Sequence, residues 1–191
     1  MKEVVLSSEQ IQDVCKKLGK QLSEDLANEE KLPLFVGVLK GGMNFFFSLV
    51  PHIERKILID FVQTSSYGGG TRSTGVVTLT KDLTLSPNGR TVVLVDDVVD
   101  TGLSMSYLIR YFELHYKPKR ILVCSLFDKK PLRKEPVNVD YAGVVLEDNR
   151  FLVGFGLDYR EMDRNLDYVY IPDDKDIAEM DRLAEQDKLA D

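Results

Sequence analysis

The segment that most constrains this chain of 191 residues is TVVLVDDVVDTGLS at positions 91–104. Apolar, mostly β-branched residues at 92–95 predict a buried strand. The strand leads directly into three carboxylates, Asp96, Asp97 and Asp100. Burying neighbouring acids is costly unless they meet cations or hydroxyl groups. The segment therefore predicts a binding site for a polar ligand at the carboxyl end of this strand.

The turn that follows, DTGLS at 100–104, has the composition of a phosphate cradle. Gly102 lets the backbone approach an anion closely, while Thr101 and Ser104 offer hydroxyl donors. A helix predicted over 105–116 adds free N–H groups and the positive end of its dipole. The two acids before the turn suit the two hydroxyls of a ribose. Together these features predict a site for a ribose 5-phosphate.

Length and composition limit the classes of protein to which this chain can belong. Its length and ordinary apolar content predict one domain with one well-buried core. The net charge of −6 argues against nonspecific binding to nucleic acid or to an anionic membrane. We expect a cytoplasmic protein, because no apolar run is long enough to cross a bilayer and the N-terminus has no signal-peptide pattern. Cys15 and Cys124 lack metal-site spacing and are expected to be buried free thiols.

The hydrophobic pattern alternates between strands and helices, which predicts an α/β fold with a mostly parallel twisted sheet flanked by helices. A first helix begins at Ser7 or Ser8, and the tail from Asp173 is expected to be a surface helix. Strands are predicted at 34–39, 56–64, 75–81, 120–127, 141–146, 151–155 and 168–171, with a helix through 45–47. Ligands bind at the carboxyl ends of the strands in such sheets. Three loops emerge there, at 40–42, 96–104 and 128–130.

The string LVDDVVDTGLS at 94–104 resembles the phosphoribosyl pyrophosphate motif of the type I phosphoribosyltransferases, and the whole chain is most similar to their hypoxanthine-guanine branch. Further matches are LKGG at 39–42, SSY at 65–67 with its glycine-rich continuation, and FLVGFGLDYREMDRN at 151–165. The resemblance implies the type I phosphoribosyltransferase fold as a single domain over 1–191. A small hood lobe over the active site would come mainly from the region after about residue 128 with the N-terminal segment.

The resemblance also implies an activity, which is purine salvage. A phosphoribosyl group would pass from phosphoribosyl pyrophosphate to N9 of hypoxanthine or guanine, with Mg²⁺ as cofactor, giving IMP or GMP and pyrophosphate. No nucleic acid or membrane partner is expected, and a homodimer or homotetramer is implied.

Roles for individual residues follow from the same resemblance. Asp100 would be the general base at purine N7, and Asp96 and Asp97 would hold the ribose hydroxyls and organise magnesium. Phosphoribosyl pyrophosphate or the nucleotide would be bound by Lys40, Gly41, Gly42, Ser66, Tyr67, Asp96, Asp97, Thr101, Gly102, Leu103, Ser104 and Arg164. Members of this family often have a cis peptide at the bond equivalent to Lys40–Gly41, and the sequence leaves the isomer there open. The loop at 67–74 is expected to close over the reacting centre.

The purine would be bound by Phe151, Leu152, Lys129 and Asp158. Phe151 would stack on the base, the Leu152 backbone would contact its pyrimidine edge, and Lys129 would donate to O6. Lys130 is adjacent, so the choice between the two lysines rests on alignment alone. Asp158 would also be a second magnesium-contacting acid, and Arg164 would bind the pyrophosphate. Arg160 and Glu161 are expected to be structural.

Two alternatives use the same fold without this reaction. One is a regulatory module that senses phosphoribosyl pyrophosphate or a nucleotide but has lost catalysis. Against it, the chain retains Lys40, Asp100, Asp158 and Arg164 together. The other is an RNA-binding pyrimidine-operon regulator resembling uracil phosphoribosyltransferase, which would need a basic face and no acid at position 100.

Overall fold

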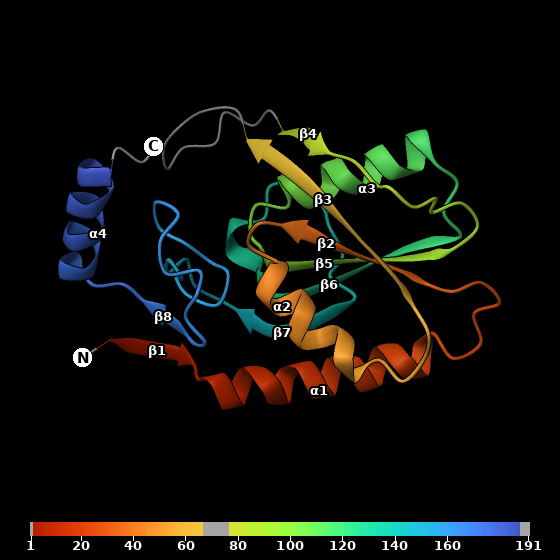
Figure 1. The fold of residues 1–191 in the computed structure, drawn as a ribbon, viewed down its shortest axis with the longest axis horizontal. Coiled ribbons are helices and arrows are strands. Elements are labelled where there is room, and N and C mark those ends of the chain that lie inside the picture. Colours follow the sequence, from red (N-terminus) through yellow and green to blue (C-terminus); the bar gives the residue numbers. More distant parts are fainter. Residues whose placement is uncertain (1, 67–76, 188–191) are drawn as a thin grey trace.

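The structure is a computed structural model that describes residues 2–66 and 77–187. A six-stranded sheet at its centre has the strand order β4-β3-β2-β5-β6-β7 (Figure 1). Its strands are β2 (Leu34–Leu39), β3 (Leu58–Ser66), β4 (Val77–Lys81), β5 (Thr91–Val99), β6 (Arg120–Lys129) and β7 (Tyr141–Leu146). All neighbouring pairs are parallel except β3 and β4. The predicted mostly parallel sheet is confirmed.

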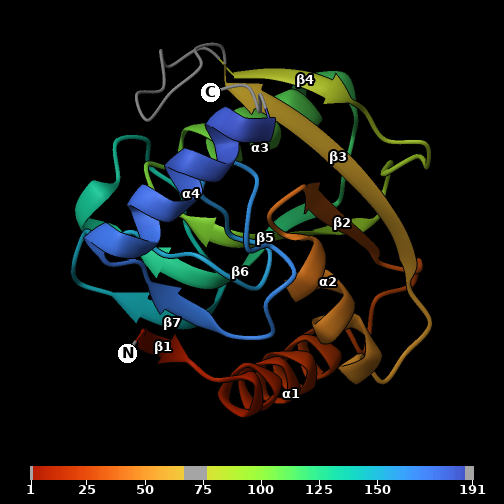
Figure 2. The same ribbon diagram turned by 60° about the vertical axis from the view of Figure 1, so that its left-hand side comes forward.

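Helices cover both faces of the sheet (Figures 1 and 2). On one face lie α1 (Ser8–Asp25) and α2 (Met43–Leu49), and on the other lies α3 (Leu103–His115). Alternate residues of β5 enter the two cores, with Val93 and Val95 packed on the α1 side and Val92 and Leu94 on the α3 side. This explains why β5 is apolar at every position from Val92 to Val95.

The first helix begins where the sequence predicts. Ser7 is the N-cap and forms a capping box with Gln10, in which each side chain bonds the other residue's backbone N–H. Cys15 in α1 and Cys124 in β6 are free and buried, as predicted. Burial raises the pKa of the Cys15 thiol to about 12, so it is unreactive near neutral pH. None of the described helices is both long and apolar enough to cross a membrane.

A second, smaller group of elements lies beside the carboxyl ends of the parallel strands (Figure 1). Strand β1 (Glu3–Leu6) pairs antiparallel with β8 (Val169–Ile171), and α4 (Asp174–Asp187) follows β8. The two 3₁₀ turns of the chain's described part are Val50–His52 and Lys130–Leu132. We call β1, β8 and α4, with the irregular segment 147–168, the hood. The extent of the domain over 1–191 stays a prediction.

The strand predicted at 151–155 is wrong. This segment forms two isolated bridges, Val153 with Tyr170 and Gly154 with Leu157, and no ladder. Gly154, Phe155 and Gly156 have φ angles of 104°, 52° and 100°, which turn the backbone away from the extended region. Leu152, Val153 and Phe155 are nevertheless buried, while Phe151 is exposed, so the pattern indicated burial for most of the segment but the wrong conformation.

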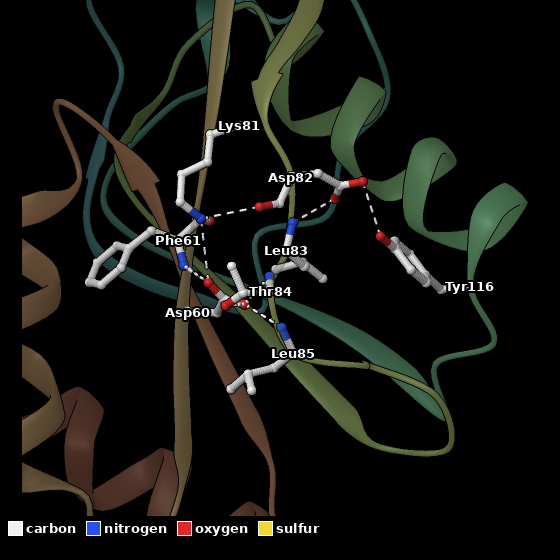
Figure 3. A network of polar contacts seen from close by, with 8 residues as sticks. All are labelled: Asp60, Phe61, Lys81, Asp82, Leu83, Thr84, Leu85 and Tyr116. Carbon is white, nitrogen blue, oxygen red and sulfur yellow. Dashed lines mark hydrogen bonds and ion pairs between the residues drawn. The ribbon is translucent and has the colours of Figure 1, made fainter.

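A buried carboxylate fixes the two strands on either side of residues 67–76 (Figure 3). Asp60 on β3 accepts hydrogen bonds from the backbone N–H groups of Phe61, Thr84 and Leu85 at 2.6–2.8 Å. Burial alone would raise the pKa of Asp60, but these hydrogen bonds together outweigh it and hold the pKa below its usual value. Asp82 adds a link to α3 by accepting from the hydroxyl of Tyr116 at 3.0 Å.

Candidate active site

The first two acids of the central motif, Asp96 and Asp97, lie inside β5 rather than after its end. The strand continues to Val99, so that Asp96 and Asp97 are strand residues. Strand β2 pairs with β5 only as far as Gly37 and Val95. Beyond that point, the chain at 40–42 turns across the open edge of β5 and meets the acids.

The glycines at 40–42 are required by this close packing. A Cβ on Gly41 would lie 2.2 Å from Oδ2 of Asp97, and one on Gly42 would lie 2.7 Å from the Val38 carbonyl oxygen. A cis peptide is present, but it joins Leu39 to Lys40. It lies one bond before Lys40–Gly41, the bond whose isomer the sequence left open.

The two acids lie side by side, Asp97 buried and Asp96 partly buried, which disfavours their ionised forms. Burial and the neighbouring Asp97 carboxylate raise the pKa of Asp96 well above its usual value. Burial also raises the pKa of Asp97, although hydrogen bonds and the Arg164 guanidinium oppose this rise. A buried carboxylate pair of this kind favours a bound cation.

The carboxylates of Asp96 and Asp97 fit a magnesium ion that is shared with a substrate better than a metal ion that is bound by protein side chains alone. Among the described residues, no cluster of three or more His, Cys, Asp or Glu side chains forms a metal site. Mg²⁺ is commonly bound through one or two carboxylates, with water and substrate oxygens completing its octahedron. Asp96 and Asp97 supply such a pair beside the predicted ribose position.

Asp100 follows β5 and carries an oxygen without a protein partner. Among the residues that the structure describes, its Oδ1 is the one buried side-chain nitrogen or oxygen atom that has no hydrogen-bond partner. Burial raises the pKa of Asp100, while Lys129, Arg133 and Lys134 oppose the rise. Buried native polar groups are rarely left unsatisfied, so this oxygen suggests a missing ligand. A carboxyl group with a raised pKa is suited to proton transfer near neutral pH.

Arg133, which the sequence analysis did not single out, holds the backbone at Asp100 in place. Its guanidinium donates to the carbonyl oxygens of Asp100 at 3.1 Å, Val99 at 3.2 Å and Val137 at 2.7 Å, and pairs with Asp128. These links connect the ends of β5 and β6. No motif or spacing in the sequence marks this arginine.

The predicted phosphate cradle forms a small cavity at the start of α3. Gly102 has a φ of 80° and is the N-cap, with no side chain capping the helix. A Cβ at Gly102 would lie 2.7 Å from the Glu135 carbonyl oxygen, so the turn requires glycine on two grounds. The cavity has a volume of about 100 Å³ and is lined by Asp96, Val98, Val99, Asp100, Thr101, Gly102, Leu103, Ser104 and Met105. An anion in it would meet the positive end of the α3 dipole.

The predicted purine residues lie at the end of β6 and in the hood. Lys129 is only 5% exposed and donates from Nζ to the Arg150 carbonyl oxygen at 2.6 Å, whereas Lys130 is exposed. Burial lowers the pKa of Lys129, and Asp100 opposes this as a nearby negative charge. The geometry therefore favours Lys129 over Lys130. Phe151 is 49% exposed, which leaves its ring free for a ligand, and Leu152 is buried.

A cluster of charges joins the β2 loop to the hood. Arg164 pairs with Asp158 at 2.8 Å and with Glu161 at 3.2 Å. Glu161 also accepts from Lys40 Nζ at 2.8 Å, and this hydrogen bond is the largest cause of its lowered pKa. The structure thus brings Lys40, Asp158 and Arg164 together, as the motif matches imply. It also shows that Glu161, expected to be structural, bridges both cations.

Three predicted residues are not shown in their predicted roles, namely Asp158, Ser66 and Tyr67. Asp158 has both oxygens engaged by the protein, since Oδ1 meets Arg164 and Oδ2 accepts from the Glu161 backbone at 2.8 Å. Its roles at magnesium and purine stay predictions. Ser66 ends β3, and Tyr67 with the loop at 67–74 lies outside the described residues.

A family model described as "Phosphoribosyl transferase domain" matches residues 4–160. The chain belongs to the phosphoribosyltransferase family. It is 40% identical over 169 residues to a hypoxanthine-guanine phosphoribosyltransferase of Bacillus subtilis (strain 168), covering 88% of this chain and 92% of that one. The same enzyme from Aquifex aeolicus (strain VF5) is 40% identical, with 90% and 95% covered.

Solved structures give the same result for the fold. A hypoxanthine phosphoribosyltransferase from Staphylococcus aureus superimposes with a TM-score of 0.84 at 38% identity, covering 92% of this chain and 93% of that one. This likeness confirms the type I phosphoribosyltransferase fold.

Proposed function

We propose that this phosphoribosyltransferase makes IMP or GMP from phosphoribosyl pyrophosphate and hypoxanthine or guanine, in purine salvage. The observation that carries the proposal is the unpartnered Oδ1 of Asp100, a residue that lines the phosphate cradle and whose carboxyl group is influenced by the charge of the buried Lys129. A base that takes a proton must be near both the sugar and the purine. The place of Asp100 in the cradle lining and the nearby charge of Lys129 support this role.

The sugar phosphate would occupy the turn and the acids of β5. Backbone N–H groups and hydroxyls at Thr101, Gly102, Leu103 and Ser104 would hold the 5-phosphate, while Asp96 and Asp97 would accept from the ribose hydroxyls. When bound there, Mg²⁺ would neutralise the leaving diphosphate through hard oxygen ligands. The chain's part is to fix the ribose so that its anomeric carbon faces the base.

The diphosphate would lie between the 40–42 loop and Arg164. Lys40 and Arg164 would provide positive charge, and the backbone of Gly41 and Gly42 would provide N–H groups. Because Glu161 pairs with both cations in this structure, a bound diphosphate would exchange for its carboxylate. Asp158 would remain beside Arg164 and orient it.

The purine would stack on Phe151, with Lys129 donating to O6 and the Leu152 backbone at its pyrimidine edge. An ammonium group donates and cannot accept, so it selects a 6-oxo group over the 6-amino group of adenine. The N9–C1′ bond would form as the C1′–O bond to diphosphate breaks, and Asp100 would take the proton from N7. Positioning and electrostatics would supply most of the rate enhancement.

The direct test is product identification. The protein is incubated with Mg²⁺, phosphoribosyl pyrophosphate and hypoxanthine, and nucleotides are separated by chromatography and identified by mass. IMP is expected, and its formation should stop when EDTA removes Mg²⁺. Binding of phosphoribosyl pyrophosphate by calorimetry without any nucleotide product would instead indicate a sensing module. Light scattering on the same sample tests the proposed dimer or tetramer.

A further inference from the structure

The turn from Asp158 to Arg164 has a strained backbone. Arg160, Glu161 and Asp163 have φ angles of 50°, 66° and 66°, in the left-handed region that non-glycine residues seldom adopt. Such residues persist when the surrounding structure holds them in place. The turn matters to the proposed reaction because it carries the charge cluster and lies beside Phe151.

Helix α4 supplies one of the contacts that hold this turn. Asp181 accepts from the Tyr159 hydroxyl at 3.0 Å and from Arg160 Nε at 2.6 Å, both through Oδ1. Met180 and Ala184 are the buried residues of α4. A cavity of about 580 Å³ separates the helix from residues 161–165, so α4 reaches the turn at its Tyr159–Arg160 end. The family-model match ends at residue 160, before α4 begins.

Tyr159 connects this contact to the purine side of the site. Its ring meets Phe151 edge-on, with centroids 5.9 Å apart and an interplanar angle of 85°. Edge-to-face pairs of this kind fix the orientation of both rings. Phe151 is half exposed and has room to rotate away, so a fixed Tyr159 restricts it.

We propose that Asp181 on α4 is a positioning residue for the purine pocket, holding Tyr159 so that its ring supports Phe151 in the base-stacking orientation. This inference rests on the proposed function, in which Phe151 stacks on the purine. The inference gives helix α4 a role in the affinity of the site for the purine base.

The diphosphate end of the site does not depend on this contact. Arg164 is anchored separately, since Asn44 donates to its carbonyl oxygen at 2.7 Å and its guanidinium donates to Gly156 O at 2.8 Å and pairs with Asp158. Loss of Asp181 should therefore affect binding of the purine and leave binding of phosphoribosyl pyrophosphate intact. A general loss of stability would affect both substrates alike.

The experiment measures kcat and both KM values for Asp181→Ala, Asp181→Asn and Tyr159→Phe in the full chain. The control is Glu185→Gln, which removes one exposed carboxylate from the same helix. Asp181→Ala should raise KM for hypoxanthine roughly twofold to tenfold, the range expected for loss of one aromatic edge contact. KM for phosphoribosyl pyrophosphate should not change. Asp181→Asn retains an acceptor for Tyr159 and should lie between wild type and Asp181→Ala.

A double-mutant cycle adds a second criterion. Because Asp181 acts through Tyr159, Asp181→Ala and Tyr159→Phe together should raise KM for hypoxanthine less than the product of their single effects. An unchanged KM for hypoxanthine in Asp181→Ala, or a parallel rise in both KM values, would overturn the inference while leaving the proposed function standing. No turnover in the wild type would overturn the proposed function and the inference with it, and a rise in KM for hypoxanthine in Glu185→Gln equal to that in Asp181→Ala would overturn the inference alone.

Discussion

Replacing Asp100 with asparagine should separate catalysis from stability. The amide keeps the shape of the side chain but cannot take the N7 proton. General-base catalysis contributes typically about 10²–10⁴ in rate, so kcat should fall by about 10² or more. That factor corresponds to about 2.7 kcal/mol of transition-state free energy. KM for both substrates should stay near wild type.

The structure predicts the opposite sign for stability. Asp100 Oδ1 is buried without a partner, and burial raises the pKa of the carboxyl group in the folded state. An ionised Asp100 therefore opposes folding above its unfolded pKa, and asparagine carries no such charge. The melting temperature of Asp100→Asn at pH 7–8 should equal or exceed that of wild type. A helix-capping role is excluded, since the N-cap of α3 is Gly102.

The assay is steady-state IMP formation, with thermal melting of the same samples. Asp13→Asn is the matched control, because it makes the same chemical change at an exposed position of α1. Its kcat and melting temperature should match wild type within error. Near-wild-type turnover by Asp100→Asn would refute the general-base role. A fall in melting temperature together with kcat would show that Asp100 is structural.

Three further outcomes follow from the site. Thr101→Ala and Ser104→Ala should raise KM for phosphoribosyl pyrophosphate more than they lower kcat, because phosphate contacts persist through the reaction; a fall in kcat at constant KM would contradict the cradle. Lys129→Met should narrow the rate difference between hypoxanthine and adenine, which substrate competition measures. Without Mg²⁺, wild-type stability should fall as pH rises from the unfolded pKa of Asp96 through its raised folded pKa, and Asp96→Asn should remove that loss. At neutral pH the melting temperature of Asp96→Asn should therefore exceed that of wild type, and the difference should disappear below the unfolded pKa of Asp96.

Local sequence signals predicted the main elements because they act within one segment. The strand and turn at 91–104 were identified from apolar runs, adjacent acids and one glycine, and the structure has β5 and the start of α3 at these positions. The N-cap at Ser7 was equally local. The segment 151–155 is apolar but is not a strand, so there the apolar pattern alone predicted the wrong element.

The parts that the sequence did not predict depend on contacts between distant segments. Glu161 and Lys40 are 121 residues apart, and neither carries a signal for the other. Arg133 bonds carbonyl oxygens, which every residue possesses, so no side-chain pattern could mark it. Asp181 lies on an amphipathic helix whose surface charges look alike in the sequence. Only the fold shows which of them faces Tyr159.

The central claim is that this chain transfers phosphoribosyl groups to 6-oxopurines, and pyrophosphate release tests it most directly. The rate is measured with saturating phosphoribosyl pyrophosphate and Mg²⁺, and with hypoxanthine, guanine or adenine added separately. Release should occur with hypoxanthine and with guanine and should remain at the purine-free background with adenine, because Lys129 can only donate. Release with adenine at a rate comparable to hypoxanthine, or no release with any purine, would contradict the account.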